Sequence, residues 1–182
     1  MSSPARLLIR PATPADLPGI TAVYGWNVLH GTGTFELEAP GIDEMARRLA
    51  EVCGKGLPWL VAQRGAALLG YAYANTFRPR PAYRFCLEDS VYLAPDAVGH
   101  GIGRVLLAEL LARCETAGAR QMLAVIGDSA NAASIALHRA FDFEPAGTLR
   151  AAGWKFERWL DVVLMQKSLG HGRAAAPVDR VG

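Results

Sequence analysis

The spacing of hydrophobic residues changes several times along the chain. Leu17, Ile20, Tyr24 and Val28 recur at steps of three and four residues, which predicts a helix with one buried stripe that ends near Gly31. The same spacing predicts three later helices, at about residues 43–53, after the glycine-rich turn at 99–103 up to residue 118, and at about 131–140.

The segments between these helices have the pattern of strands. They lie at residues 7–9, 59–62, 68–77, 86–93, 121–126, 146–152 and 155–166. Arg64-Gly65 predicts a tight turn between the second and third of them, and Gly153 predicts one between the last two. The order of elements predicts one α/β domain over residues 1–167, with helices on both faces of a mixed sheet, and a mobile tail over 168–182.

Composition limits the class of protein. The 182 residues carry 19 Lys+Arg and 17 Asp+Glu, and this net charge of +2 gives no reason to expect a nucleic-acid or membrane partner. No apolar run approaches the roughly 20 residues of a membrane span, and the first residues lack the apolar core of an export signal. Cys53, Cys86 and Cys114 are widely spaced, which favours reduced thiols over a disulfide framework. We therefore expect a cytoplasmic globular protein.

The most specific local feature is the glycine-rich turn between a strand and a helix. Gly99, Gly101 and Gly103 let the backbone approach a ligand closely, and the free N–H groups of the first helical turn favour a phosphate or pyrophosphate. A plain strand-to-helix turn is the alternative. The segment lacks the Gly-Lys-Ser/Thr of a Walker loop and matches a dinucleotide fingerprint only loosely.

This turn resembles the acetyl-CoA pyrophosphate loop of the GCN5-related N-acetyltransferase (GNAT) superfamily, written Q/R-x-x-G-x-G/A. Val98 departs from the first position, so any pyrophosphate contact must rest on backbone N–H groups, His100 and Arg104. Within the superfamily the chain is most similar to the phosphinothricin and methionine sulfoximine N-acetyltransferases, over about residues 6–167. The likeness rests on the segments IRPA (9–12), FRPRPAYR (77–84), EDSVY (88–92), NAASIALH (131–138) and KFERWLD (155–161).

The resemblance implies the GNAT fold, with a mostly antiparallel central sheet, and acetyl-CoA as co-substrate. In relatives a bulge splays the strand that faces the pantetheine. The residues to which the resemblance gives acetyl-CoA contacts are Val91, Tyr92, Leu93, Gly99, His100, Gly101, Ile102, Gly103, Arg104, Asn131 and Ser134. Asn131 could equally be a simple N-cap, and both roles can coexist. Asp142 stands where relatives often have glycine, so we expect the local geometry to differ there.

Acetyl transfer to an amine needs a base, because only a neutral amine attacks a thioester and an α-amine is mostly protonated at neutral pH. Glu88 is the candidate, since it lies on the strand leading to the glycine turn and the resemblance gives the matching glutamate this role. Its neighbour Asp89 should point to the other face of the strand. A solvated or salt-bridged carboxylate is the alternative for Glu88.

His138 is the candidate that assists the departure of the CoA thiolate. Many relatives have tyrosine there, and the resembled subfamily has histidine, whose pKa suits proton transfer near neutrality. Asn131, Ser134 and His138 lie at steps of three and four, so their side chains share one face of a helix. A helix histidine satisfied by a backbone carbonyl is the alternative.

A proline-rich loop before Glu88 carries Arg78, Arg80 and Tyr83. Two guanidinium groups can hold an α-carboxylate by paired hydrogen bonds and so orient the α-amine, whereas a solvated surface loop is the alternative. The resemblance also implies three residues that close the substrate pocket, namely Phe35, Lys155 and Phe156. Lys155 and the arginines at 78, 80 and 104 are expected to meet the anionic groups of the two substrates.

These features predict direct transfer of an acetyl group, within a ternary complex, to the α-amine of a small amino-acid analogue. We expect Cys86 to be a buried, inert thiol, so that no acyl-enzyme forms. No cluster of His, Cys and Asp has ligand spacing, and we predict no catalytic metal.

The sequence leaves two alternative functions and does not determine the oligomeric state. The alternatives are acetylation of another amine, such as a peptide N-terminus or a polyamine, and a non-catalytic acyl-CoA sensor. Arg78 and Arg80 argue against a polyamine, and Glu88 and His138 argue against a sensor. The resembled enzymes are commonly homodimers, and the segment 159–165 belongs either to such an interface or to the core of the sheet.

Overall fold

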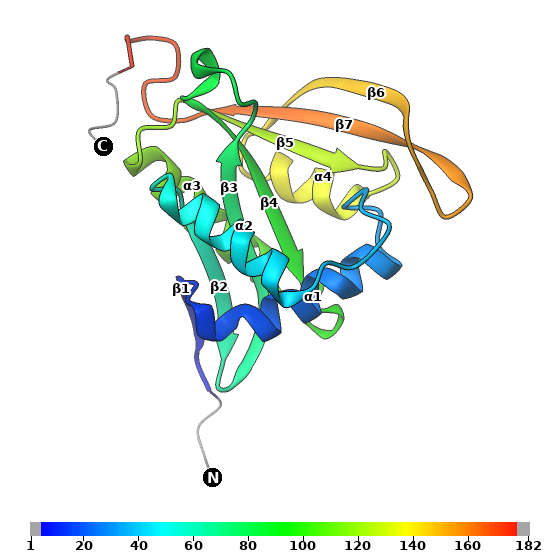
Figure 1. Cartoon of the computed structure of the whole chain (residues 1–182). Coiled ribbons are helices and arrows are strands. Elements are labelled where there is room, and N and C mark those ends of the chain that lie inside the picture. Colours follow the sequence, from blue (N-terminus) through cyan, green and yellow to red (C-terminus); the bar gives the residue numbers. More distant parts are fainter. Residues whose placement is uncertain (1–4, 178–182) are drawn as a thin grey trace.

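The computed structural model describes residues 5–177, which build one seven-stranded sheet (Figure 1). The strands are β1 (Leu7–Pro11), β2 (Trp59–Arg64), β3 (Ala67–Thr76), β4 (Cys86–Leu93), β5 (Gln121–Gly127), β6 (Glu144–Lys155) and β7 (Arg158–Ser168). Their order across the sheet is β1-β2-β3-β4-β5-β7-β6. Neighbouring strands are antiparallel except β4 and β5, which are parallel. The predicted mixed, mostly antiparallel sheet is therefore confirmed.

Four α-helices cover the two faces of this sheet. They are α1 (Leu17–His30), α2 (Ile42–Gly54), α3 (Ile102–Thr116) and α4 (Ala132–Arg139). Tyr92 of β4 packs against α1, whereas Asp89 is hydrogen-bonded to His138 of α4 and Leu93 lies beside Gly103 of α3. Because odd and even residues of a strand point to opposite faces, α1 covers one face and α3 and α4 cover the other, as predicted.

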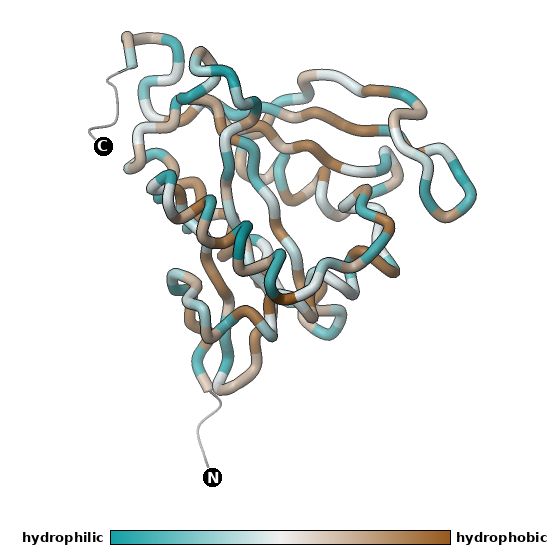
Figure 2. The backbone as a smooth tube through the Cα atoms, viewed as in Figure 1, coloured by the Kyte–Doolittle hydropathy of each residue, from teal (hydrophilic) through white to brown (hydrophobic). Residues whose placement is uncertain are grey.

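The core lies between the sheet and the buried stripes of the helices. Hydrophobic stretches follow the strands of the sheet (Figure 2). The stripe predicted for α1 is buried at all four positions, and α2 buries its apolar side chains in the same way; these residues are Leu17, Ile20, Tyr24, Val28, Met45, Leu49 and Val52. Burial of one such side chain contributes about 1.5–3 kcal/mol, so these stripes fix the helices against the sheet.

The turn between β6 and β7 is not where the sequence placed it. The prediction of a turn at Gly153 is wrong: Gly153 lies within β6, and the turn is formed by Phe156 and Glu157, whose φ angles are 52° and 56°. A Cβ at Gly153 would collide with the ring of Phe35. The glycine therefore permits a close approach between two segments and does not reverse the chain.

Strands β6 and β7 continue beyond the end of β5 as a two-stranded ribbon (Figure 1). Almost every residue of β6 is exposed. On β7, Leu160 and Met165 are buried while Trp159 is 62% exposed and packs edge-on against Trp154 across the ribbon. The whole segment 159–165 thus belongs to the sheet, with some side chains in the core and that of Trp159 on the surface.

The ordered packing of the domain continues past residue 167, to Ser168 and Leu169. Strand β7 continues to Ser168, and Leu169 is buried, with its N–H donating to the carbonyl of Arg120 at 3.0 Å. Of the tail predicted to be mobile, residues 178–182 lie outside the described residues, and the mobility of the remainder stays a prediction. Among the helices of residues 5–177, none is long and apolar enough to cross a membrane.

Candidate functional site

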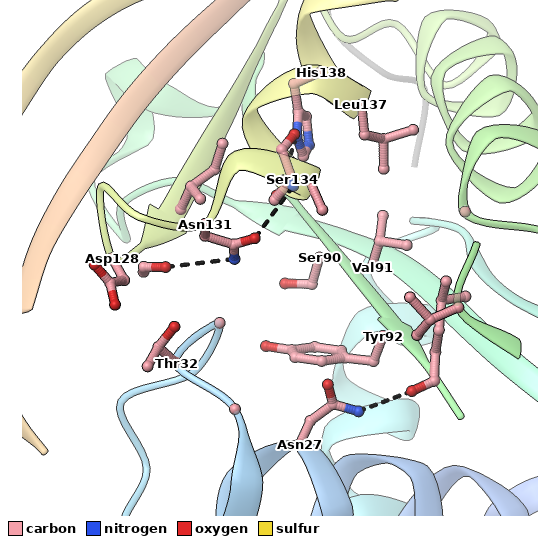
Figure 3. A pocket seen from close by; sticks show the side chains of 18 of the residues that line it. Asn27, Thr32, Ser90, Val91, Tyr92, Asp128, Asn131, Ser134, Leu137 and His138 are labelled. Atoms are coloured by element: carbon pink, nitrogen blue, oxygen red, sulfur yellow. Dashed lines mark hydrogen bonds between the residues drawn. The ribbon is translucent and has the colours of Figure 1, made fainter. Parts of the chain in front are cut away.

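A cleft of about 710 Å³ opens where β4 and β5 separate (Figure 3). The two parallel strands pair only from Cys86 opposite Gln121 to Asp89 opposite Ala124, although β4 continues to Leu93 and β5 to residue 127. Residues of β4, β5, α1, α3 and α4 line the space between the diverging ends. The cleft therefore has its narrow end at Asp89 and widens toward the N-terminus of α3.

The backbone of β4 is free to bind a ligand along this cleft. The carbonyl of Cys86 accepts from Phe77 on the β3 side, so alternation directs the backbone groups of Val91 and Leu93 toward β5, which no longer pairs with them. The carbonyl of Leu93 accepts a 3.0 Å hydrogen bond from Nδ2 of Asn27. The pairing of β3 with β4 runs in one register throughout, so the divergence from β5, without a bulge in β4, opens the cleft.

The glycine-rich turn forms the wide end of the cleft. Gly99 and Gly101 have φ angles of 83° and 75°, which only glycine adopts freely, and nothing lies within 4 Å of a Cβ at either position. Gly101 is the N-cap of α3, whose first N–H groups lack intrahelical partners. Val98 and Arg104 line the cleft as well, with the Arg104 guanidinium 5.5 Å from the centre of the Phe141 ring. The turn thus presents backbone donors and one cation.

Helix α4 contributes the polar residues of the opposite wall. Oδ1 of Asn131 accepts a 3.2 Å hydrogen bond from the N–H of Ser134, so Asn131 is the N-cap of the helix, and Ser134 Oγ lies 3.4 Å from Nδ1 of His138. All three side chains lie on the cleft side of α4, as their spacing predicted (Figure 3). Because Asn131 both caps the helix and lines the cleft, the two roles weighed from the sequence are compatible.

His138 is buried and has a hydrogen-bond partner on each ring nitrogen. Nε2 lies 2.9 Å from Oδ2 of Asp89, and Nδ1 lies 2.8 Å from the carbonyl oxygen of Ser134. Burial opposes a charge on the ring, yet the hydrogen bond and attraction to Asp89 outweigh it and raise the pKa of His138. The carbonyl-satisfied histidine considered from the sequence is what the structure shows at Nδ1.

Glu88 points to the opposite face of β4 from Asp89, as the alternation of the strand predicts. Burial, and then the negative charge of Asp89, raise the pKa of Glu88 to about 7, while the nearby guanidinium of Arg78 opposes the shift. The Glu88 side chain does not line the cleft, but Glu88 lies directly before Asp89, which lines its narrow end. A carboxyl with this pKa can accept a proton near neutral pH.

Comparisons with known proteins decide what kind of site this is. Residues 29–143 match the model of the acetyltransferase (GNAT) family. The chain is 53% identical to phosphinothricin N-acetyltransferase of Alcaligenes faecalis, covering 93% of this chain and 86% of that protein. The chain belongs to the GNAT acetyltransferase family.

Two further relatives show how far the likeness extends. An L-methionine sulfoximine/L-methionine sulfone acetyltransferase of Pseudomonas aeruginosa is 42% identical, covering 92% of this chain and 97% of that protein. The crystal structure of a GNAT phosphinothricin acetyltransferase from Sinorhizobium meliloti in complex with AcCoA superposes with a TM-score of 0.93 at 49% identity, covering 96% of this chain and 95% of that one. The expected family and the expected GNAT fold are confirmed.

In this acetyltransferase, most residues expected at the cofactor do line the cleft. These are Val91, Tyr92, Leu93, Gly99, Gly101, Ile102, Gly103, Arg104, Asn131 and Ser134, whereas His100 is exposed and does not line it. Their role in binding stays a prediction.

The proline-rich loop of the acetyltransferase lies outside the cleft, on the Glu88 side. Arg78 is near enough to Glu88 to affect its pKa, and its guanidinium lies 5.0 Å from the centre of the Phe77 ring. Tyr83 packs edge-on against the same ring, at 5.8 Å between centroids. Arg80 precedes a short 3-10 helix, Pro81–Tyr83, that keeps the loop compact. Arg78 is thus a loop residue whose charge acts on the candidate base Glu88.

Lys155 is buried and contacts backbone carbonyls, and its expected contact with an anionic substrate group stays a prediction. Its buried Nζ donates to the carbonyls of Gly31 at 2.9 Å and Thr34 at 2.8 Å. Phe35, in the same loop, packs against Gly127 and Gly153, whereas Phe156 is 48% exposed. These contacts hold the loop between α1 and α2 against β5 and β6, and Gly31 also lines the cleft.

Several residues that line the cleft were missed in the sequence. Asn27 of α1 carried no recognisable signal, because a single polar residue on an apolar helix is common. Asp128 follows the end of β5 with φ of 71°, where it accepts from the N–H of Ala130 and forms an ion pair of 2.6 Å with Arg158. An acidic residue directly after a buried strand is a signal in the sequence that could have identified Asp128.

Among residues 5–177, no three His, Cys, Asp or Glu side chains gather as metal ligands do. The expectation that catalysis needs no metal stays a prediction.

Proposed function

We propose that this acetyltransferase transfers the acetyl group of acetyl-CoA to the α-amine of a small amino-acid analogue of the phosphinothricin, methionine sulfoximine or methionine sulfone type. The observation that carries the proposal is the pKa of Glu88, raised to about 7, on β4 directly before Asp89, whose side chain lines the cleft. The names of the relatives at 53% and 42% identity support the acceptor class.

The cleft offers what the co-substrate requires. Acetyl-CoA supplies a thioester carbonyl for attack by an amine and an anionic pyrophosphate. Val98 supplies no side-chain donor for the pyrophosphate. The backbone N–H groups at Gly99, Gly101 and the start of α3, with the Arg104 side chain, suit this role. The free backbone groups of Val91 suit the amides of the pantetheine chain.

Glu88 acts as the base in this proposal. The amine nitrogen bonds to the thioester carbon, its proton passes to the Glu88 carboxylate directly or through water, and the carbon–sulfur bond breaks to release CoA. A carboxylate whose pKa is raised is a stronger base than an ordinary glutamate at the same pH. Burial, followed by the charge of Glu88, raises the pKa of the Cys86 thiol, which therefore stays protonated at neutral pH and favours direct transfer over an acyl-enzyme.

Arg78 and Arg80 orient the acceptor. A guanidinium near Glu88 can hold the α-carboxylate of an amino acid. Because the α-amine is attached to the same α-carbon as the carboxylate, it then faces the base. Tyr83 and the exposed ring of Phe156 complete the binding surface outside the cleft. This arrangement favours an anionic amino-acid analogue over a polycation.

The test is an acetyl-CoA consumption assay on methionine sulfone, methionine sulfoximine, phosphinothricin, a polyamine and a short peptide. We expect turnover with the amino-acid analogues, and a mass increase of one acetyl group on their α-amine. Turnover with the peptide or polyamine alone would overturn the acceptor class, and binding of acetyl-CoA without turnover of any amine would favour the sensor. Glu109→Gln, in an exposed ion pair with Arg113, serves as a control that should keep full activity.

We further propose that the acetyltransferase works in the cytosol as a homodimer. Cys53, Cys86 and Cys114 form no disulfide with one another, which suits a reducing compartment. The exposed edge of β6 and the exposed ring of Trp159 suit an interface with a second copy.

A further inference from the structure

Asp89 and His138 form a buried pair whose protons can be counted from geometry. Their side chains are 2% and 5% exposed, so solvent supplies no partners. A carbonyl oxygen only accepts, and the carbonyl of Ser134 lies 2.8 Å from Nδ1, so Nδ1 carries a proton. A carboxylate also only accepts, and Oδ2 of Asp89 lies 2.9 Å from Nε2. One further proton must therefore lie between these two atoms.

This arrangement leaves His138 without a free ring nitrogen. Both nitrogens already have oxygen atoms of the protein as hydrogen-bond partners, so neither can reach a thiolate unless the buried pair breaks. The ring is also fixed by the edge of Phe143, with 5.0 Å between ring centroids. The geometry therefore does not favour proton donation by His138, the role that the sequence suggested.

The charged groups around the pair belong to several elements. On β4, Glu88 lies on the opposite face one residue away, and on α4, Arg139 is exposed. Strand β5 places the apolar Ala124 opposite Asp89. The other charged or titratable residues that line the cleft are His30, Tyr92, Arg104, Asp128 and Arg158, of which the last two form an ion pair with each other. Outside the pair, the charge of Asp89 raises the pKa of Glu88.

The pair also joins two parts of the site. Asp89 is the last residue of β4 that pairs with β5, and His138 lies one turn after Ser134 on the helix that Asn131 caps. The hydrogen bond between them therefore fixes α4 against β4 at the narrow end of the cleft. It fixes the same point of the strand from which Glu88 projects on the other side.

We propose that Asp89 is a positioning residue which, with a positively charged His138, fixes the narrow end of the cleft and maintains a negative charge behind Glu88. His138 shares this role and does not protonate the leaving thiolate. The inference rests on the proposed function for its consequence in catalysis. Its structural content, the protonation of His138 and the effect of Asp89 on Glu88, can be measured without any turnover.

The first test is nitrogen NMR of the protein with ¹⁵N-labelled histidine, with His138 assigned from the spectrum of His138→Gln. We expect both ring nitrogens of His138 to be protonated at pH 7. In Asp89→Asn the amide can donate to Nε2, so the ring should become neutral while the hydrogen bond is kept. An unprotonated Nε2 in the wild type at pH 7 would overturn the proposal.

The second test is a carboxyl ¹³C titration of Glu88. Asp89 is the chain neighbour of Glu88 and raises its pKa, whereas His138 lies on α4, so the loss of the Asp89 charge should outweigh the loss of the His138 charge and Asp89→Asn should lower the pKa of Glu88. Asp43→Asn, at the exposed start of α2, should leave it unchanged. An unchanged Glu88 titration in Asp89→Asn would overturn the proposal, even if the variant had lost activity by local loosening.

The third test separates this inference from the proposed function. In an enzyme that acetylates amino-acid analogues, His138→Gln should lower kcat but keep the wild-type shape of the pH profile above pH 8. If His138 protonated the thiolate, the wild-type rate would fall as pH rose through its pKa, and this fall would be absent from His138→Gln; that outcome would overturn the proposal. If the wild type acetylates no amine, the proposed function fails, and the two NMR measurements still decide the state of the pair.

Discussion

At the scale of single residues, Lys155 shows how a charged side chain can support the wall of a site. The residue is 4% exposed, and burial lowers the pKa of Lys155, against a weaker attraction from Glu36. Two loop carbonyls, those of Gly31 and Thr34, accept its hydrogen bonds. Because Gly31 lines the cleft, the position of this wall depends on Lys155.

Lys155→Met should therefore affect both stability and binding. It leaves two carbonyls without donors, which costs about 1–3 kcal/mol, and we expect a lower Tm and a higher KM for acetyl-CoA. Lys55→Met is the matched control, because Lys55 is exposed and its ion pair with Glu51 contributes at most about 1 kcal/mol. Thermal unfolding and steady-state kinetics check both variants. Unchanged Tm and KM in Lys155→Met would contradict this assignment.

Residue types near the site could be predicted from the sequence, but their partners could not. Glu88 and His138 were identified from their positions in short segments of the chain. The partner of His138 is Asp89, 49 residues earlier, and only the packing of α4 against β4 brings them together. Lys155 and the Gly31 carbonyl are 124 residues apart, so its structural role could not be predicted from local sequence.

At the scale of elements, the spacing of hydrophobic residues predicted the order of helices and strands, because one buried face per element determines both period and position. The turn between β6 and β7 could not be predicted in this way. Phe156 and Glu157 adopt left-handed φ angles that bulky residues rarely take, while Gly153 is required by its contact with Phe35 from a distant loop. Asp142 stands where relatives often have glycine, and a change of local geometry was expected there. Asp142 has a left-handed φ of 61°, a conformation that glycine adopts freely.

At the scale of the whole molecule, the ribbon of β6 and β7 extends past the end of β5, where no third strand pairs with it in the described sheet. Strand β6 forms one edge and is exposed on both faces, and Leu149, Trp154 and Trp159 are each more than half exposed. A long edge strand with exposed apolar side chains is a site for association, and natural proteins usually cover it.

The homodimer can be tested by light scattering coupled to size-exclusion chromatography. We expect the wild type to have twice the mass of the chain, and Trp159→Lys to shift toward the monomer because a charge would be placed in the interface. Trp26→Lys, on the exposed side of α1, should remain dimeric. A wild type that is monomeric at tens of micromolar, or a Trp159→Lys protein that stays dimeric, would contradict this interface.

The most direct test of the central claim is the pH dependence of kcat/KM for acetylation of an amino-acid analogue such as methionine sulfone. Glu88 must be ionised to accept a proton, so the rate should rise as pH increases through a pKa near 7. Glu88→Gln should lose this limb and about 10²–10⁴-fold of the rate, while any titration of the amine itself remains in both profiles. A wild-type limb that persists in Glu88→Gln, or a variant with the wild-type rate, would contradict the account.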